Sequence, residues 1–249
     1  MKPTTITAIL ATLLTQVVHG SPQPRQDAKP PYFILTGDST VAVNGGWGDG
    51  FLSFVADPAS GVNKGDSGAT TVSYRNEFWD EVLSEVANTV SDYEPIVTIQ
   101  FGHNDQKTLT LEEYGDNLEA LATDVQGAGG TPIIITSLTR RAFENGEVIQ
   151  NLADWRAEAI NSAKDVGIQY LDLNIASTDY VNAIGEENGH TYDLSDGDST
   201  HLNAAGEVVF GRMVADLMLE ARPDFEGYFT PNEALSEKIA NGEYATGDE

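Results

Sequence analysis

The sequence of 249 residues contains no cysteine, which excludes a disulfide scaffold, a thiolate zinc site and a cysteine nucleophile. Basic residues are also scarce: 13 lysines and arginines stand against 39 aspartates and glutamates, giving a formal charge of -26. Such a surface repels phosphate groups, so we expect neither a nucleic-acid partner nor a membrane-surface partner. Only four histidines occur, and their spacing matches no zinc motif, so we predict no metal and no cofactor.

Long hydrophobic runs are missing apart from one near the N-terminus, where residues 6–18 follow the positive charge of Lys2. Small residues at the −3 and −1 positions then precede Ser21, a pattern typical of a cleaved secretory signal. The run is too short for a membrane span, which needs about 20 apolar residues. We therefore expect a signal peptide over residues 1–20, a proline-rich flexible lead-in over 21–31, and a secreted protein.

Strand-type and helix-type patterns alternate along the rest of the chain. The predicted strands are Tyr32–Leu35, Ile96–Ile99, Pro132–Thr136 and Ile168–Leu173, with a weaker one near Val62 and Asn63. The predicted helices are Asn76–Val90, Leu111–Val125, Leu152–Val166 and Asn203–Glu220. Short β–α units with uninterrupted apolar strands predict an α/β fold, in which helices cover both faces of a parallel sheet. We expect one domain over 32–221 and an acidic C-terminal tail with one short helix over 222–249.

Three polar clusters fall where an open α/β sheet binds its ligands, at strand ends or helix starts. Ser39, in Gly-Asp-Ser-Thr, follows the first predicted strand, and Asn104, in Gly-His-Asn-Asp, follows the second long one. Asp198 and His201 stand three residues apart just before the last helix, and a glycine-rich loop over residues 63–68 lies between the first two clusters. Each cluster alone fits an ordinary turn, polar loop or helix cap, but their combination predicts one chemical site.

The combined residue types are those of an acyl-transfer site. A serine hydroxyl such as that of Ser39 needs a base, and His201 can take its proton while Asp198 holds the imidazole in the correct tautomer. Asn104 offers an amide donor, and Gly68 lets a backbone N–H approach the oxygen on which negative charge develops. The order of Ser, Asp and His along the chain is that of other α/β hydrolases.

These residues resemble the SGNH or GDSL hydrolase superfamily, which is named for a Ser, a Gly, an Asn and a His in four blocks. The matches are Ser39, Gly68, Asn104 and the Asp198-x-x-His201 pair. Gly65, in the same loop as Gly68, is an alternative for the glycine of the second block. The start Gly-Asp-Ser-Thr-Val-Ala and the Thr-Arg-Arg at 139–141 are more similar to rhamnogalacturonan acetylesterases, carbohydrate esterase family 12.

The resemblance, which runs from about Tyr32 to Leu219, implies a three-layer α/β/α sandwich with a flavodoxin-like parallel sheet. It also implies an enzyme that removes O-acetyl groups from plant cell-wall polysaccharide, with rhamnogalacturonan or another pectin as the expected substrate. Ser39 would carry the acetyl group, and the N–H groups of Ser39 and Gly68 with the amide of Asn104 would form the oxyanion hole. We expect the enzyme to act as a monomer.

Arg140 and Arg141 are candidate substrate contacts, because the implied polymer is anionic and the chain is strongly acidic. Ion pairing with Glu144 or Glu147 is an equally good interpretation of both arginines. Acetylated xylan or another neutral polymer is the alternative substrate, and a general GDSL-type esterase or lipase is the alternative enzyme. A glycosidase with paired carboxylates and a carbohydrate-binding module are less favoured, because neither explains the serine, asparagine and histidine clusters.

Overall fold

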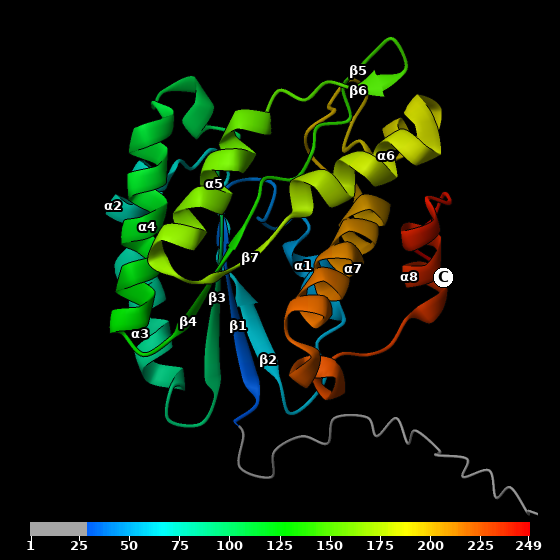
Figure 1. The fold of residues 1–249 in the computed structure, drawn as a ribbon. Coiled ribbons are helices and arrows are strands. Elements are labelled where there is room, and N and C mark those ends of the chain that lie inside the picture. The colour runs from blue at the N-terminus through cyan, green and yellow to red at the C-terminus, as the bar shows by residue number, and fades with distance from the viewer. Residues whose placement is uncertain (1–28) are drawn as a thin grey trace, which may run out of the picture.

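A five-stranded sheet forms the centre of the computed structural model, which describes residues 29–249 (Figure 1). The strands are β1 (Pro31–Gly37), β2 (Ser60–Asn63), β3 (Glu94–Gln100), β4 (Thr131–Ile135) and β7 (Gln169–Leu171), in the order β2-β1-β3-β4-β7. All neighbouring pairs are parallel, so the predicted parallel sheet with flavodoxin-like strand order is confirmed. The predicted signal peptide and most of the lead-in lie outside the described residues.

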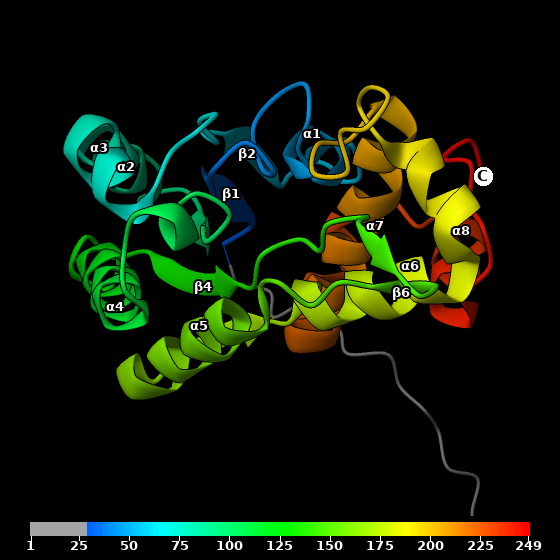
Figure 2. The ribbon, with the colours of Figure 1, turned by 90° about the horizontal axis from the view of Figure 1, so that it is seen from above.

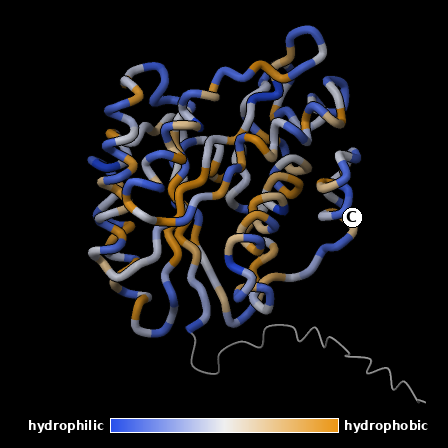
Figure 3. Tube along the Cα trace, viewed as in Figure 1, coloured by the Kyte–Doolittle hydropathy of each residue, from blue (hydrophilic) through white to orange (hydrophobic). Residues whose placement is uncertain are grey.

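Helices cover both faces of this sheet. They are α1 (Gly48–Ser53), α2 (Thr71–Glu77), α3 (Trp79–Thr89), α4 (Leu111–Gly127), α5 (Ala153–Val166), α6 (Leu173–Gly189), α7 (Ala204–Ala221) and α8 (Glu233–Asn241). A short hairpin of β5 (Phe143–Glu144) and β6 (Glu147–Val148) projects beside them. Successive residues of β1 alternate between the faces: Phe33 and Leu35 pack with α1, α6 and α7, whereas Ile34 packs with α2 to α5. Figure 3 shows the resulting concentration of hydrophobic residues in the strands. The predicted three-layer α/β/α sandwich is thus confirmed.

The register of the sheet sets the position of the functional loops. Gly37, the last residue of β1, pairs with Gln100, the last residue of β3. The loops that follow the two strands therefore start side by side at the same edge of the sheet. Figure 2 looks onto this edge, where the segments after β1 and β3 and the segment before α7 come together.

Two of the predicted elements differ from the observed ones. The predicted helix Asn76–Val90 is two helices, α2 and α3, because the backbone at Phe78 is not helical (φ −124°). The predicted strand Ile168–Leu173 ends at Leu171, and Leu173 begins α6, a helix that the sequence analysis did not predict. The buried face of α6 includes Asn174 and Ser177, so it lacks the continuous apolar stripe from which a helix is recognised.

The C-terminal segment contains the one predicted short helix, α8, but it is not an appended tail. Phe225 and Phe229 are buried and lie against Phe33 of β1, with ring centroids 5.9 and 5.5 Å apart. Leu235 of α8 is also buried in the same core. The boundary predicted at residue 221 therefore does not separate this segment from the core, because several of its apolar side chains are buried there. Within residues 29–249, no helix has both the length and the apolar character needed to cross a membrane.

Candidate active site

A tight turn after β1 presents the nucleophile. Gly37 has no room for a side chain, because a Cβ there would overlap with the carbonyl oxygen of Gln100. The next residue, Asp38, is fully buried, and its Oδ1 accepts hydrogen bonds from the N–H of Thr40 (2.9 Å) and from the Thr40 hydroxyl (2.7 Å). This closed turn places Ser39 at the edge of the sheet with its side chain directed away from the core.

Ser39, His201 and Asp198 form a hydrogen-bonded chain. The Oγ of Ser39 lies 2.9 Å from Nε2 of His201, and Nδ1 of His201 lies 2.9 Å from Oδ2 of Asp198. Because an ionised carboxylate can only accept, Nδ1 carries the hydrogen and Nε2 keeps its lone pair for the serine proton. The structure thus brings together the three residues that the sequence analysis predicted to be catalytic.

The backbone around Asp198 favours its ionised form. Its Oδ1 accepts hydrogen bonds from the N–H groups of Thr200 (3.1 Å) and His201 (3.0 Å), in addition to its contact with the imidazole. Burial alone would raise the pKa of Asp198, but these hydrogen bonds and the charge of His201 bring the pKa below its usual value. An ionised Asp198 can orient the imidazole and stabilise the imidazolium formed during catalysis.

The loop after β2 is attached to both neighbouring loops. The N–H of Asp66 donates to the carbonyl oxygen of Gly37 (2.9 Å), and Nδ2 of Asn104 donates to the carbonyl oxygen of Ala69 (3.0 Å). Asn104 therefore lies beside Gly68, and one of its two amide hydrogens remains available. The structure places the predicted oxyanion residues together at the strand ends.

Gly68 fits the predicted oxyanion role better than Gly65. Gly68 has a φ of +86°, and no other atom lies within 4 Å of the place where its Cβ would be, so it faces open space. No hydrogen bond among residues 29–249 uses the N–H of Gly68 or that of Ser39. In contrast, the N–H of Gly65 donates to Oδ1 of Asn63 (3.0 Å). Gly68 and Ser39 thus have N–H groups free to bind an oxyanion.

Two buried residues on either side of Asn104 hold its loop. Oδ1 of Asp105 accepts from the N–H (2.8 Å) and the hydroxyl (2.7 Å) of Thr71, at the start of α2. Nε2 of His103 lies 2.8 Å from the carbonyl oxygen of Leu138. Burial and the nearby charge of Arg140 lower the pKa of His103 to about 3, so His103 is neutral near pH 7. Asp105 belongs to the Gly-His-Asn-Asp cluster but is not among the predicted site residues.

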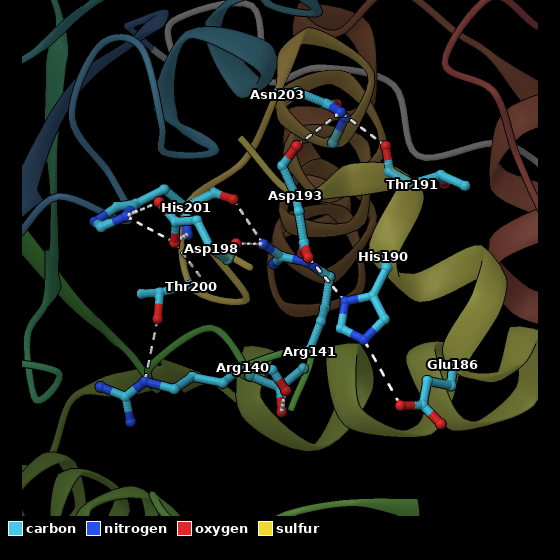
Figure 4. Close-up of polar contacts among 12 residues, drawn as sticks. Arg140, Arg141, Glu186, His190, Thr191, Asp193, Asp198, Thr200, His201 and Asn203 are labelled. Carbon is cyan, nitrogen blue, oxygen red and sulfur yellow. Dashed lines mark hydrogen bonds and ion pairs between the residues drawn. The ribbon is translucent and has the colours of Figure 1, made fainter. Parts of the chain in front are cut away.

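Arg141 lies on the backbone side of His201, and the imidazole extends away from it (Figure 4). Its side chain is 0% exposed, and its Nε donates to Oδ1 of Asp193 at 2.7 Å. Its Nη2 donates to the carbonyl oxygen of His201 (2.6 Å), and its backbone N–H donates to the carbonyl oxygen of Ser199 (2.8 Å). The prediction that Arg141 contacts the substrate is therefore wrong, because no part of its side chain reaches the surface. Asp193, which the sequence analysis did not include in the site, also contacts Nδ1 of His190 at 2.8 Å.

Arg140 has a different environment from its neighbour. Its side chain is partly buried, and its Nε donates to the hydroxyl of Thr200 at 3.3 Å, next to His201. Neither Arg140 nor Arg141 pairs with Glu144 or Glu147 among the described residues, so that alternative is not observed. Arg140 remains a candidate for contact with the substrate.

Comparison with known proteins places the chain in a family. The model of the GDSL-like lipase/acylhydrolase family matches residues 35–209, which include the catalytic candidates. The rhamnogalacturonan acetylesterase RhgT of Bacillus subtilis is 30% identical over 212 residues, which cover 76% of this chain and 89% of RhgT.

Two solved structures show the same fold. One is the YXIM protein of Bacillus subtilis, with a TM-score of 0.67, 21% identity, 79% of this chain covered and 58% of that chain. The other is Axe2, an acetylxylan esterase from Geobacillus stearothermophilus, with a TM-score of 0.57, 16% identity, 79% of this chain covered and 95% of that chain. Together with the matched family model, the contact between Ser39 and His201 leads to one conclusion. The chain belongs to the GDSL-like lipase/acylhydrolase family and is a carboxylic ester hydrolase.

Proposed function

We propose that this protein is an acetylesterase that removes O-acetyl groups from rhamnogalacturonan or a related pectic polysaccharide. The observation that carries the proposal is the hydrogen-bonded chain from Ser39 through His201 to Asp198, beside the unused N–H of Gly68. The similarity to RhgT, which is named a rhamnogalacturonan acetylesterase, supports this class of substrate. The acetyl group is a small acyl group, so the proposal requires only a small pocket beside Ser39.

The proposed reaction has two steps. In the first, Nε2 of His201 takes the hydroxyl proton of Ser39 while Oγ forms a bond to the acetyl carbonyl carbon. The N–H groups of Ser39 and Gly68 and the amide of Asn104 donate to the oxyanion, and His201 then gives the proton to the departing sugar oxygen. In the second step, His201 takes a proton from water, which attacks acetyl-Ser39, and the proton returns to Oγ as acetate leaves.

Acetate release from a panel of acetylated polymers tests the substrate. We expect the wild-type enzyme to release acetate from acetylated rhamnogalacturonan faster than from acetylated xylan, and Ser39→Ala to release none above background. Faster release from xylan would contradict the pectic substrate and favour a neutral-polymer acetylesterase. A serine-directed phosphonate that labels Ser39 would test the covalent step, and labelling of any other residue would contradict it.

We also propose that the enzyme acts outside the cell, because residues 1–20 have the pattern of a secretory signal. Expression of the full chain in a secreting host should release a protein into the medium whose first residue, by intact-mass measurement, is Ser21. Retention of the full-length protein inside the cells would contradict secretion.

A further inference from the structure

Arg140 differs from every other arginine in residues 29–249, because it alone forms no ion pair with a carboxylate. The paired arginines are Arg75, Arg141, Arg156, Arg212 and Arg222. The chain has 39 acidic residues, so a nearby carboxylate is the usual surrounding of an arginine in this molecule. The exception lies beside the active site, where a free guanidinium has a chemical use.

The position of Arg140 directs its guanidinium towards the catalytic groups. The hydroxyl of Thr200, which accepts from Nε of Arg140, belongs to the residue next to His201. In Figure 4 the guanidinium and the imidazole of His201 extend to the same side, with Thr200 between them. The charge of Arg140 also acts on Asp38 and on His103, the neighbours of Ser39 and Asn104. Arg140 therefore lies at the rim of the site, within reach of a sugar whose ester is bound at Ser39.

The two terminal nitrogens of the Arg140 guanidinium favour an anionic ligand. Only Nε of Arg140 is bonded within the described residues, so Nη1 and Nη2 can present parallel donors. This fork matches the two oxygens of a carboxylate, and a neutral hydroxyl would leave its charge unpaired. Lys107, whose Nζ lies 2.8 Å from Oδ1 of Asn104, adds a second positive charge beside the oxyanion residue Asn104.

We propose that Arg140 binds the carboxylate of a uronic acid in the polysaccharide and thereby selects acetyl groups on acidic sugar chains over those on neutral chains. The inference rests on the proposed acetylesterase function, because it assumes that a sugar polymer enters the site. It also explains how a protein with a formal charge of -26 accepts an anionic polymer. The acidic surface repels the polymer in general, and one unpaired arginine provides the local attraction.

A competing role for Arg140 is to balance the charge of the buried Asp38. Asp38 attracts Arg140, but the two side chains form no direct ion pair, and Oδ2 of Asp38 has no hydrogen-bond partner within residues 29–249. If Arg140 only balanced Asp38, its removal would disturb the turn that presents Ser39. Acidic and neutral ligands would then be affected equally.

Inhibition of aryl acetate hydrolysis separates these roles without requiring the natural substrate. The inhibitors are a de-acetylated oligogalacturonate and a neutral xylo-oligosaccharide of equal length, each tested at low salt. The variants are Arg140→Gln, Arg140→Lys and the matched control Arg75→Gln, whose arginine on α2 pairs with Asp124 of α4. For oligogalacturonate we expect Arg140→Gln to raise the inhibition constant at least about tenfold, the typical effect of losing a charged hydrogen bond. Arg140→Lys should recover part of the loss, and Arg75→Gln should match the wild type.

Three results would overturn the inference: a wild-type enzyme that oligogalacturonate does not inhibit, an unchanged inhibition constant in Arg140→Gln, or equal weakening of both inhibitors. Failure of the proposed function looks different. In that case the wild-type enzyme hydrolyses the aryl acetate but releases no acetate from acetylated rhamnogalacturonan, and the inhibition constants still report on Arg140.

Discussion

The two halves of the active site are held in place by different means. Ser39 and Asn104 lie directly after β1 and β3, whose last residues are paired in the sheet. His201 and Asp198 lie on the segment before α7, and no strand of the sheet leads directly into it. The nucleophile side is therefore positioned by the sheet, whereas the histidine side depends on side-chain and loop contacts.

Buried polar side chains complete the nucleophile side. The amide of Gln100, at the end of β3, accepts from Nε1 of Trp47 (2.8 Å) and donates to the hydroxyl of Thr40 (2.6 Å). The N–H of Asp38 donates to the backbone oxygen of the same glutamine (3.3 Å). Several independent hydrogen bonds therefore fix the turn that presents Ser39, and the loss of one leaves the others.

The histidine side is held by contacts between loops. The N–H of Leu194 donates to the carbonyl oxygen of His201 (3.0 Å), and the N–H of Leu202 donates to that of Gly45 (2.8 Å). Nδ2 of Asn203 also donates to the carbonyl oxygens of Thr191 (2.7 Å) and Asp193 (3.1 Å). The Arg141–Asp193 ion pair, which is almost entirely buried, adds a charged contact. The nucleophile is therefore positioned by paired strands of the sheet, whereas the general base is positioned by contacts between loops, among which the Arg141–Asp193 pair is a buried charged one.

The largest expected effect comes from removing one reacting group on each side. Ser39→Ala and His201→Ala should each lower aryl acetate turnover by on the order of 10⁴-fold or more, because the two groups act as a unit. Initial rates with purified variants measure the loss, and thermal unfolding checks that the fold is kept. If His201→Ala kept a tenth of the wild-type turnover, the assignment of the base would be wrong.

The next effect tests the oxyanion residues on the sheet side. Asn104→Ala should lower kcat by roughly 10²–10³-fold, because an oxyanion donor acts mainly in the transition state. KM for an aryl acetate should change much less than kcat. A change in KM alone would show that Asn104 binds substrate without stabilising the transition state. The contact between Asn104 and the backbone of Ala69 predicts a small additional loss of stability.

The sheet side is also the part of the site that the sequence predicts best. Ser39 and Asn104 follow apolar strands, of which β3 is rich in β-branched residues, and such strands can be recognised from a few consecutive residues. The parallel order of the strands then brings the two loops to one edge without further information. His201 and Asp198 are predictable for another reason: they stand three residues apart, so their contact is local.

The supports of the histidine side could not be predicted in the same way. Arg141 and Asp193 are 52 residues apart, and nothing in the loop sequence indicates that this arginine is buried. Its other contacts are with backbone carbonyl groups, which every residue has. Helix α6 was not predicted for a similar reason, because its buried face contains polar residues whose partners are distant in the sequence. Nδ2 of Asn174 bonds the carbonyl oxygen of Ser137, a tertiary contact with no local sequence pattern.

Two variants, each with an arginine of an ion pair replaced by glutamine, test how much the buried pair on the histidine side contributes. Arg141→Gln leaves Asp193 buried without its cation, and we expect it to lower the free energy of unfolding by about 3 kcal/mol or more. Arg75→Gln breaks the half-exposed pair with Asp124 and should cost at most about 1 kcal/mol. Urea denaturation of both variants measures the difference.

Arg141→Gln should also affect catalysis through His201. Loss of the donor to the His201 carbonyl oxygen lets the imidazole move away from Ser39, and kcat should fall about 10- to 100-fold with a smaller change in KM. Arg141→Lys keeps the charge and should recover part of the activity. Normal kcat in a destabilised Arg141→Gln would show that the ion pair supports the fold without positioning the base.

The most gradual expected effect is on the pH dependence of stability, because it builds up over several pH units, and it belongs to the sheet side. Burial, together with the charge of Arg140, lowers the pKa of His103 to about 3, whereas a histidine in the unfolded chain has its pKa near 6.5. Between these values the unfolded state binds the proton and the folded state does not. The contribution of His103 is therefore complete above pH 6.5 and is lost as the pH falls towards 3.

The slope due to His103 is at most about 1.4 kcal/mol per pH unit, which corresponds to one proton. His103→Gln keeps an amide donor for the carbonyl oxygen of Leu138 and removes the titrating ring. Urea denaturation of the wild type and this variant between pH 4 and 7 should show a steeper fall in stability for the wild type, while the other titrating groups contribute equally to both. Parallel curves would mean that His103 takes up its proton without unfolding, and that the edge of the sheet carrying Asn104 is less tightly closed than its hydrogen bonds indicate.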